Sequence, residues 1–420
     1  MMDGENTKGG REREYNPSDA ARGLTNTVLP DAADSGSRPM GIYIHFPFCL
    51  RKCSYCDFYS IPYQADLAEE YCSALCCEIE RVADRQEWGT AISVYLGGGT
   101  PSLMSPAQIQ RLFAHIHRFF TVAADCEITM EANPDTVSLD RLKAGCEAGI
   151  NRISLGVQSF NESELELLGR IHSRDAVCRS VENVVKAGIT NYGLDLIYGI
   201  PGQGLPEWLH NLEEAIKLVP AHLSCYLLQM EEMVPLALRL QKGEVAALPE
   251  EEESDMYYAA VNRLKHAGYQ HYEISNFCRP GAACRHNLNY WEAGDYLGIG
   301  AGAVSFKGGV RYWNLPQIRQ YTRNLLSKGS EPPREVLESL ISREQLGCDA
   351  MIMGLRMIRG INVDEFEKRF GLQPQTAFAD ALQKSREERL LEYHHPWLRL
   401  TPQGYFLSNR VFVRILEAIL

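Results

Sequence analysis

The sequence predicts an α/β fold, a partial (β/α)6 barrel followed by a C-terminal winged-helix-like α+β domain. From Gly41 the chain alternates apolar, strand-like runs with amphipathic, helical runs. Alternation of this kind builds βαβ units around a parallel sheet. From about residue 335 the pattern changes to three helical stretches, a β-hairpin pattern and a last helix. These two observations divide the chain into a barrel and a smaller module.

Six runs have the length and the apolar content of buried strands. They cover residues 41–46, 91–99, 127–133, 152–158, 192–199 and 223–228. The helical stretches between them lie near residues 65–83, 106–119, 138–147, 161–187 and 206–218. In barrel folds the chemistry takes place at the carboxyl ends of the strands. The residues that follow each run are therefore the first candidates for a site.

Four segments result from this division. They are a disordered polar tail (1–39), the barrel (40–270), a connector (271–334) and the C-terminal domain (335–420). The tail has no apolar stretch of the kind found in a secretory signal, and its mixture of acidic and basic residues suits a transit peptide poorly. A cytoplasmic location is therefore predicted.

Composition excludes some classes of function. The net charge of −12 disfavours a general nucleic-acid binder, and no apolar run approaches the roughly 20 residues of a membrane helix, so we expect neither nucleic acid nor an integral membrane segment. Thirteen cysteines, an odd number, in a chain without a secretory leader indicate reduced thiols.

The C-terminal module raises one competing hypothesis, because winged-helix modules often bind DNA. Residues 342–420 contain eleven Lys and Arg against ten Asp and Glu. The second helical stretch carries no basic stripe, so the electrostatic footprint of DNA binding is missing. We interpret the module as a lid or docking surface.

Three cysteines stand apart from the others. Cys49, Cys53 and Cys56 have CxxxCxxC spacing in a loop after the first strand, and Phe58 stands where a fourth cysteine could sit. Three thiolates on an iron–sulfur cubane leave one iron free to take a ligand from a substrate or cofactor. The alternatives are incidental thiols and a zinc site, although the CxxC pairs usual for zinc are absent.

Polar or glycine residues follow the apolar runs. Each alone has an ordinary explanation, such as a tight turn or a solvated charge, but several at one end of successive strands indicate a site. The candidates are Gly98, Gly99 and Thr100 after the second strand, Glu131 in the third, Gln158 at the end of the fourth, Arg170 beyond it, and Asp195 in the fifth.

The cysteine spacing resembles the radical S-adenosylmethionine (SAM) superfamily, in which CxxxCxxC holds a [4Fe–4S] cluster whose open iron binds the cofactor. The stretches YIHFPFCLRKCSYC, YLGGGTPS, EANPDT, LGRIHS and LDLIYGIPGQ are similar to the coproporphyrinogen-oxidase-like branch of that superfamily. The resemblance spans roughly residues 41–420. It implies that Cys49, Cys53 and Cys56 hold the cluster. The implied SAM contacts are Tyr43, Tyr55, Gly98, Gly99, Thr100, Glu131, Gln158, Arg170 and Asp195.

Two types make up this branch. The oxygen-independent coproporphyrinogen III dehydrogenase has a fourth cysteine two residues after the third, whereas the heme chaperone type, HemW, has phenylalanine there, as this chain has Phe58. The heme chaperone type also carries HNxxYW, and residues 286–291 read HNLNYW.

The HNLNYW segment has features that suit heme. His286 could offer a nitrogen to heme iron, while Tyr290 and Trp291 could offer flat apolar surface. The glycine-rich residues 292–306 are expected to form a loop that approaches the macrocycle. The ordinary explanation is that the two aromatic residues belong to the core and that His286 is a hydrogen-bonded loop histidine. Cys278 and Cys284 are left open, as ligands or as plain thiols.

The resemblance implies a chaperone that binds heme and passes it to an acceptor protein, with cluster and SAM assisting. Whether the chain is also an enzyme stays open. The alternatives are coproporphyrinogen III dehydrogenase, which decarboxylates propionates, and a radical SAM enzyme acting on another substrate.

Overall fold

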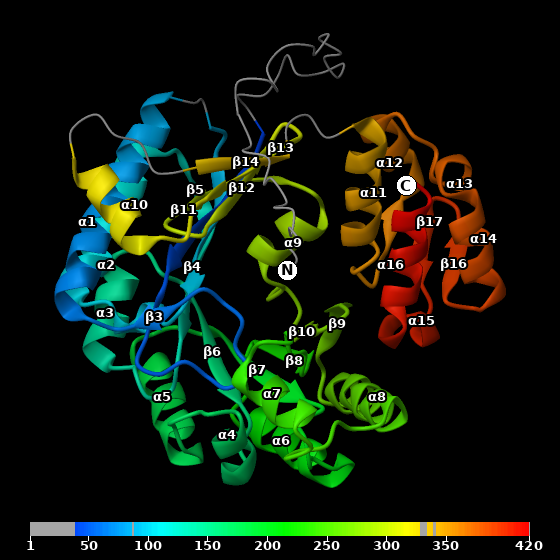
Figure 1. Ribbon diagram of the computed structural model, residues 1–420, viewed down its shortest axis with the longest axis horizontal. Coiled ribbons are helices and arrows are strands. Elements are labelled where there is room, and N and C mark those ends of the chain that lie inside the picture. Colours follow the sequence, from blue (N-terminus) through cyan, green and yellow to red (C-terminus); the bar gives the residue numbers. More distant parts are fainter. Residues whose placement is uncertain (1–37, 86–87, 328–333, 339–341, 420) are drawn as a thin grey trace, which may run out of the picture. The chain divides into compact units, whose positions relative to one another are not determined.

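Figure 1 shows the computed structural model, which describes residues 38–85, 88–327, 334–338 and 342–419. Nearly all of the predicted polar tail (1–39) lies outside these residues. Within the part of the chain that is described, no helix combines the length and apolar character that a membrane span requires.

Six parallel strands form the barrel wall, as predicted from the alternation of apolar runs. They lie side by side in chain order, each hydrogen-bonded to the next. Their bounds are β1 Met40–Phe46, β4 Ala91–Gly98, β5 Val122–Ala132, β6 Arg152–Gln158, β7 Asn191–Tyr198 and β8 His222–Leu227. In β1, Ile42, Ile44 and Phe46 are fully buried in the core, so the alternate residues Tyr43 and His45 face the barrel interior.

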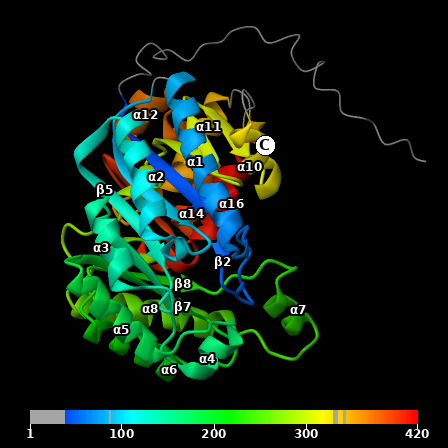
Figure 2. The same ribbon diagram turned by 90° about the vertical axis from the view of Figure 1, so that its left-hand side faces the viewer.

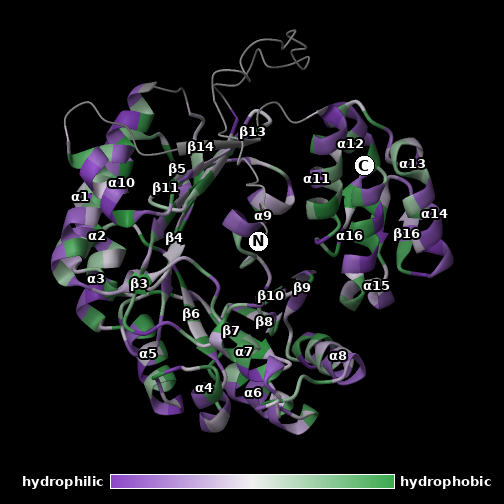
Figure 3. Cartoon of the chain, viewed as in Figure 1, coloured by the Kyte–Doolittle hydropathy of each residue, from purple (hydrophilic) through white to green (hydrophobic). Residues whose placement is uncertain are grey.

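Helices cover the outer side of this wall. They are α1 Ala65–Arg85, α2 Pro106–Phe119, α3 Leu139–Glu147, α4 Glu162–Leu167, α5 Arg174–Lys186 and α6 Leu205–Lys217. Figure 2 shows α1 beside α2 in front of the sheet, and Figure 3 shows hydrophilic and hydrophobic residues mixed along helices such as α5. Their amphipathic character fits helices with one face on a sheet and one in solvent.

The prediction of one helical stretch over residues 161–187 was wrong in one respect. Helix α4 ends at Leu167, Gly169 has a left-handed φ of 73°, and Ser173 caps the start of α5 through its side chain. A glycine in that conformation ends a helix at little cost. The break leaves Arg170 in a loop at the carboxyl ends of the strands.

The connector extends both edges of the sheet. Strand β11 (Asp295–Ile299) joins β1 in parallel, and three antiparallel strands follow it outward. These are β12 Val304–Lys307, β13 Val310–Asn314 and β14 Arg334–Glu338. The opposite edge carries β10 Asn276–Cys278 and β9 Gln270–Glu273.

The glycine-rich residues 292–306 were expected to form a loop, and that expectation was wrong. Most of them belong to β11 and β12. A Cβ added at Gly298 would lie 2.1 Å from the carbonyl oxygen of Val304. The glycine therefore permits close packing of the chain against itself.

Shorter elements complete the barrel. They are β2 Phe48–Cys49, β3 Ile61–Pro62, the 3-10 helix η2 Pro101–Leu103, α7 Pro235–Gln241, α8 Glu250–His266, α9 Arg285–Trp291 and α10 Ile318–Leu326. Strands β2 and β3 pair with each other beside the cysteine loop.

The C-terminal residues form the predicted helices and hairpin around a hydrophobic cluster of their own. The helices are α11 Arg343–Gly354, α12 Val363–Phe370, α13 Pro374–Ala377, α14 Ala379–Glu387, α15 Pro402–Phe406 and α16 Ser408–Glu417. The hairpin is β16 Leu391–His394 with β17 Trp397–Leu400, and β15 Ile361–Asn362 adds a third strand. Gly371 ends α12 with a φ of 64°.

One fully buried carboxylate fastens the added strands to α1. Glu78 accepts hydrogen bonds from the Gly300 amide at 2.8 Å, from the Asn314 side chain at 2.8 Å and from the Tyr321 hydroxyl at 2.6 Å. A buried charge is tolerated only when such donors surround it. Glu78 therefore fixes where the β11–β13 segment sits.

We predict that Glu78→Ala lowers the free energy of unfolding by at least about 2 kcal/mol, because three donors lose their acceptor. Urea unfolding followed by circular dichroism measures the change. Glu80→Ala, on the exposed side of the same helix, is the control and should change stability little. Equal effects of the two substitutions would contradict the role given to Glu78.

Candidate functional site

The three predicted cysteines lie in one loop at the carboxyl ends of the barrel strands. Each is a free, half-buried thiol. The Thr100 hydroxyl lies 3.6 Å from Cys49 Sγ, and Arg170 Nη1 donates to Cys53 Sγ at 3.3 Å. Since Thr100 follows β4 and Arg170 follows α4, the loop is held from two sides.

The donor set fits an iron–sulfur cluster better than a single metal ion. No three His, Cys, Asp or Glu side chains in the described ranges are arranged to hold one ion. In a [4Fe–4S] cluster the cysteine thiolates are spread over different irons, so the thiols need not converge on one point. Burial raises the pKa of Cys56 to about 11, so the bound irons would have to stabilise its thiolate.

Glu131 stands inside the barrel with both carboxylate oxygens engaged. It accepts from the Tyr95 hydroxyl at 2.8 Å and from the Gly98 amide at 3.0 Å. Burial raises its pKa to about 7, and these two hydrogen bonds only partly offset that shift. A carboxylate held this way can accept a further hydrogen bond from a ribose or an amine.

The glycine turn at the end of β4 has no room for side chains. A Cβ at Gly98, where φ is 107°, would lie 2.4 Å from the His45 ring, and one at Gly99 would lie 2.6 Å from the Phe48 carbonyl oxygen. The glycines thus allow β4 to end directly against the segment that leads into the cysteine loop.

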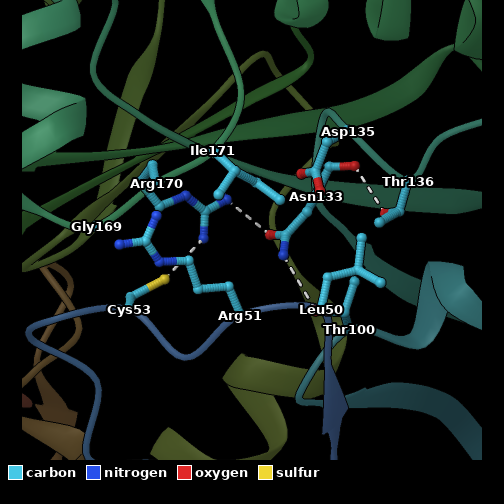
Figure 4. A pocket seen from close by; sticks show the side chains of 10 residues that line it. All are labelled: Leu50, Arg51, Cys53, Thr100, Asn133, Asp135, Thr136, Gly169, Arg170 and Ile171. Carbon is cyan, nitrogen blue, oxygen red and sulfur yellow. Dashed lines mark hydrogen bonds between the residues drawn. The ribbon is translucent and has the colours of Figure 1, made fainter. Parts of the chain in front are cut away.

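Arg170 joins the cysteine loop to two strands (Figure 4). Besides Cys53, it donates to Asn133 Oδ1 at 2.8 Å and to the Gly156 carbonyl at 2.7 Å. Its Nε is buried and has no hydrogen-bond partner. An unpartnered buried donor beside three thiols leaves capacity for one more acceptor, as a bound anionic group would supply.

Asp195 and Gln158 complete the predicted strand-end group. Asp195 accepts from the Ser154 hydroxyl at 3.0 and 3.2 Å, and burial raises its pKa although hydrogen bonds from Ser224 and Ser154 oppose the shift. Gln158 adopts a left-handed φ of 67°, which is uncommon for a residue other than glycine. Such conformations cluster at functional sites.

The two predicted tyrosines lie on either side of this group. The Tyr43 hydroxyl lies 2.9 Å from His45 Nδ1, and its ring stacks on Tyr95 with 6.3 Å between the ring centroids. Tyr55, inside the cysteine loop, packs on a small apolar cluster that includes Leu168 and Leu236. The structure therefore brings the predicted SAM contacts to the barrel interior and to the ends of its strands, although the Tyr43 ring also lies 6.4 Å from the His286 ring, measured between centroids.

The HNLNYW segment lies at the other end. It forms α9, and the amides of Arg285 and His286 donate to the Glu127 carboxylate at 3.1 Å each. His286 Nδ1 lies 2.9 Å from Ser93 Oγ. Ser93 is five residues before Gly98 on β4, so roughly 16 Å of strand separates α9 from the glycine turn. The helix closes the amino end of the barrel.

His286 is deeply buried, with 1% of its surface exposed. Its Nε2 lies 3.0 Å from the Tyr290 hydroxyl, so both ring nitrogens have partners. Burial lowers its pKa to about 3, which keeps the ring neutral. Trp291 lies under Arg356, with 4.5 Å from the guanidinium carbon to the ring centroid. Iron ligation by His286 stays a prediction, and it would require one of these hydrogen bonds to open.

Sequence reasoning missed three residues that shape the site. Tyr95 links Glu131 to His286, on whose ring it stacks with 5.0 Å between centroids. Asn133 bridges Arg170 and Thr100, and Ser154 holds Asp195. Period-two counting along β4 could have found Tyr95, because it shares a face with Gly97. Cys278 and Cys284 are both buried thiols.

Comparison with known proteins gives the family. A family model described as the radical SAM superfamily matches residues 43–215, and a HemN C-terminal domain model matches residues 341–407. The heme chaperone HemW of Bacillus subtilis is 35% identical over 371 residues, which cover 88% of this chain and 97% of that protein. The chain belongs to the HemW family of radical SAM proteins.

Other relatives agree with this membership. The heme chaperone HemW of Haemophilus influenzae is 41% identical and matches 89% of this chain and 97% of its own length. The bovine radical S-adenosyl methionine domain-containing protein 1, mitochondrial, is 31% identical over 95% of this chain and 92% of its own. The coproporphyrinogen III oxidase (HemN) structure from Escherichia coli superposes with a TM-score of 0.79 at 24% identity, covering 90% of each chain. That likeness confirms the predicted fold.

We predict that Arg170→Ala and Asp195→Ala each weaken SAM binding without unfolding the chain. Losing one charge-assisted hydrogen bond costs about 1.5–3 kcal/mol, or roughly 10–150-fold in affinity. Anaerobic calorimetry with reconstituted protein measures the affinity, and the exposed Arg179→Ala is the control. Wild-type affinity in both variants would remove these residues from the cofactor site.

The raised pKa of Glu131 predicts a pH effect on stability. Below about pH 4.5 the carboxyl is protonated in both folded and unfolded states, and it costs nothing. Between about pH 4.5 and 7 the folded state keeps a proton that the unfolded state releases, so stability falls as pH rises, by about 1.4 kcal/mol for each unit. Above about pH 7 this loss is complete.

Glu131→Gln should remove that part of the pH dependence, because glutamine imitates the protonated carboxyl and does not titrate. Urea unfolding of wild type and variant at pH 5, 6 and 7, without cofactor, gives the comparison. Parallel stability curves for the two proteins would show that Glu131 titrates at its ordinary pKa.

Proposed function

We propose that this chain is a heme chaperone, which binds heme and passes it to an acceptor protein. The nearly full-length similarity to proteins named heme chaperones carries the proposal. Cys49, Cys53 and Cys56 would hold a [4Fe–4S] cluster, and SAM would bind exchangeably at the strand ends. The cluster, with its open iron, would supply a place for the cofactor's amino and carboxylate groups.

The chain's own residues would then position the cofactor. Arg170, already on Cys53, has one donor to spare, and Glu131 and Asp195 line the interior next to it. A cationic cofactor beside these carboxyls would favour their ionised forms, which burial disfavours in its absence. Binding of SAM would therefore favour ionised Glu131 and Asp195 in the barrel interior.

The main alternative is the coproporphyrinogen III dehydrogenase. Phe58 argues against it, because that type has a cysteine there, and an aromatic ring cannot replace a thiol in redox chemistry or hydrogen bonding. The Phe58 side chain is 64% exposed. A radical SAM enzyme acting on another substrate is the other alternative. We also propose a cytoplasmic location and no nucleic-acid partner, from the composition.

The deciding experiment compares reconstituted wild type with the Cys49→Ala, Cys53→Ala, Cys56→Ala triple variant under anaerobic conditions. The wild type should hold about 4 Fe per chain, as a single cubane does, and take up heme stoichiometrically. The triple variant should lose the iron. Neither protein should convert coproporphyrinogen III to protoporphyrinogen when SAM and a reductant are present.

Three results would count against the proposal. Full cluster absorbance in the triple variant would mean that other residues hold the iron. Multiple turnovers of coproporphyrinogen III by the wild type would favour the dehydrogenase. Failure of the wild type to take up heme, or to yield a heme-loaded acceptor, would remove the chaperone function.

A further inference from the structure

The buried position of HNLNYW leaves open where heme binds. Both nitrogens of His286 have partners, and Trp291 is covered on one face by Arg356. A heme that docks from solvent needs exposed apolar surface for its flat ring, which this helix does not offer in the structure.

Exposed large apolar side chains gather at the opposite end of the barrel. Four of them form what we call the rim: Leu50, Phe58, Ile171 and Met233, which are 50%, 64%, 51% and 80% exposed. All lie in loops on the side of the barrel where the strands end. Leu50 and Phe58 flank the cysteines, Ile171 follows Arg170, and Met233 lies in the loop before α7. Gathered apolar exposure marks a binding surface more often than scattered residues do.

Hydrogen bonds hold the loops of the rim together. The Ser54 amide donates to the Leu168 carbonyl at 3.0 Å, and its hydroxyl donates to the Leu167 carbonyl at 2.7 Å. The Leu236 amide donates to the Ser54 carbonyl at 2.8 Å. Leu50 and Ile171 also line one pocket with Cys53 and Arg170 (Figure 4). The cysteine loop, the loop after α4 and the start of α7 therefore meet at Ser54.

The charged residues next to the rim distinguish heme from an uncharged apolar ligand. Arg51 and Lys52 are exposed between Leu50 and Cys53, and neither forms an ion pair with any residue of the described ranges. The exposed acidic residues next to the same loops are Asp57, Asp135, Glu231 and Glu232, the last two directly before Met233. Two free cations beside an apolar surface, on a chain of net charge −12, suit a flat apolar molecule that carries two carboxylates.

We propose that the rim, together with Arg51 and Lys52, is the heme-docking surface. The macrocycle lies across the apolar side chains, and its two propionates meet the two cations. This inference rests on the proposed function and names the site of its cargo. It places heme next to the cysteine loop and assigns the HNLNYW helix a structural role. An apolar segment of an acceptor protein is the rival occupant, but it would not need two adjacent cations.

The test compares three matched variants with wild type. Phe58→Ser with Met233→Ser removes two rim side chains, and Arg51→Glu with Lys52→Glu reverses the charge. Val185→Ser with Val413→Ser removes two side chains of similar exposure, 56% and 52%, from α5 and α16. Iron content and circular dichroism establish that each variant is folded and carries its cluster. Heme absorbance titration gives the affinity, and apomyoglobin as scavenger gives the heme dissociation rate.

The rim variant should bind heme roughly 10-fold or more weakly, because apolar contact is lost. The charge variant should also bind weakly, and its affinity should rise with salt where that of wild type falls, because salt then screens a repulsion. The control should match wild type. Heme binding by the rim variant equal to wild type would overturn the site and leave the chaperone function intact, whereas absence of heme binding by wild type would remove the function itself.

Two further results would also overturn the site. A His286→Gln variant that loses the wild-type heme spectrum, while the rim variant keeps it, would place the ligand in HNLNYW. Unchanged heme affinity in the rim variant together with lost delivery to the acceptor would assign the rim to the acceptor protein.

Discussion

A single buried carboxylate connects the two ends of the barrel interior. Glu131 holds the Gly98 amide with one oxygen and the Tyr95 hydroxyl with the other. Through Gly98 it fixes a turn that packs on His45 and on the strand that enters the cysteine loop. Through Tyr95 it reaches the ring of His286. Glu131 therefore links the turn beside the cysteine loop to the helix at the far end, and it is itself costly to bury.

Helix α9 contacts both the barrel strands and the C-terminal domain. Its inner face bonds to Ser93 and Glu127 on the barrel strands, while Arg356 covers Trp291 and Arg369 donates to the Glu292 carbonyl at 2.5 Å. The Ile274 amide also donates to the Arg356 carbonyl at 3.1 Å. HNLNYW is thus one of the elements that meet both parts, which gives its polar and aromatic residues a structural reason to stand where they do.

The barrel and its cysteine loop could be predicted because they follow local rules. Apolar runs of strand length and the CxxxCxxC spacing need no knowledge of distant contacts. The burial of His286 could not be predicted, because Ser93 lies 193 residues away from it in the chain. The glycines of residues 292–306 led to a wrong prediction for a related reason. A glycine can make room for a ligand or for a neighbouring strand. Only the structure shows that the backbone at Val304 occupies the space beside Gly298. The inward position of Tyr95 could be predicted from the period-two pattern of β4, whereas its hydrogen bond to Glu131 could not.

The closed amino end constrains how a cargo and a cofactor could influence each other. Helix α9 packs on Glu127 and Ser93 at the amino end. The loops at the carboxyl ends of the strands carry the three thiols, the unpartnered Arg170 nitrogen and exposed apolar side chains. On the proposed assignments, SAM would lie in the interior below the cysteine loop and heme across its outer surface. Any coupling between them would then pass through the loop around Ser54, whose backbone and side chain hold three segments together. Direct contact of this kind requires no long-range change of shape.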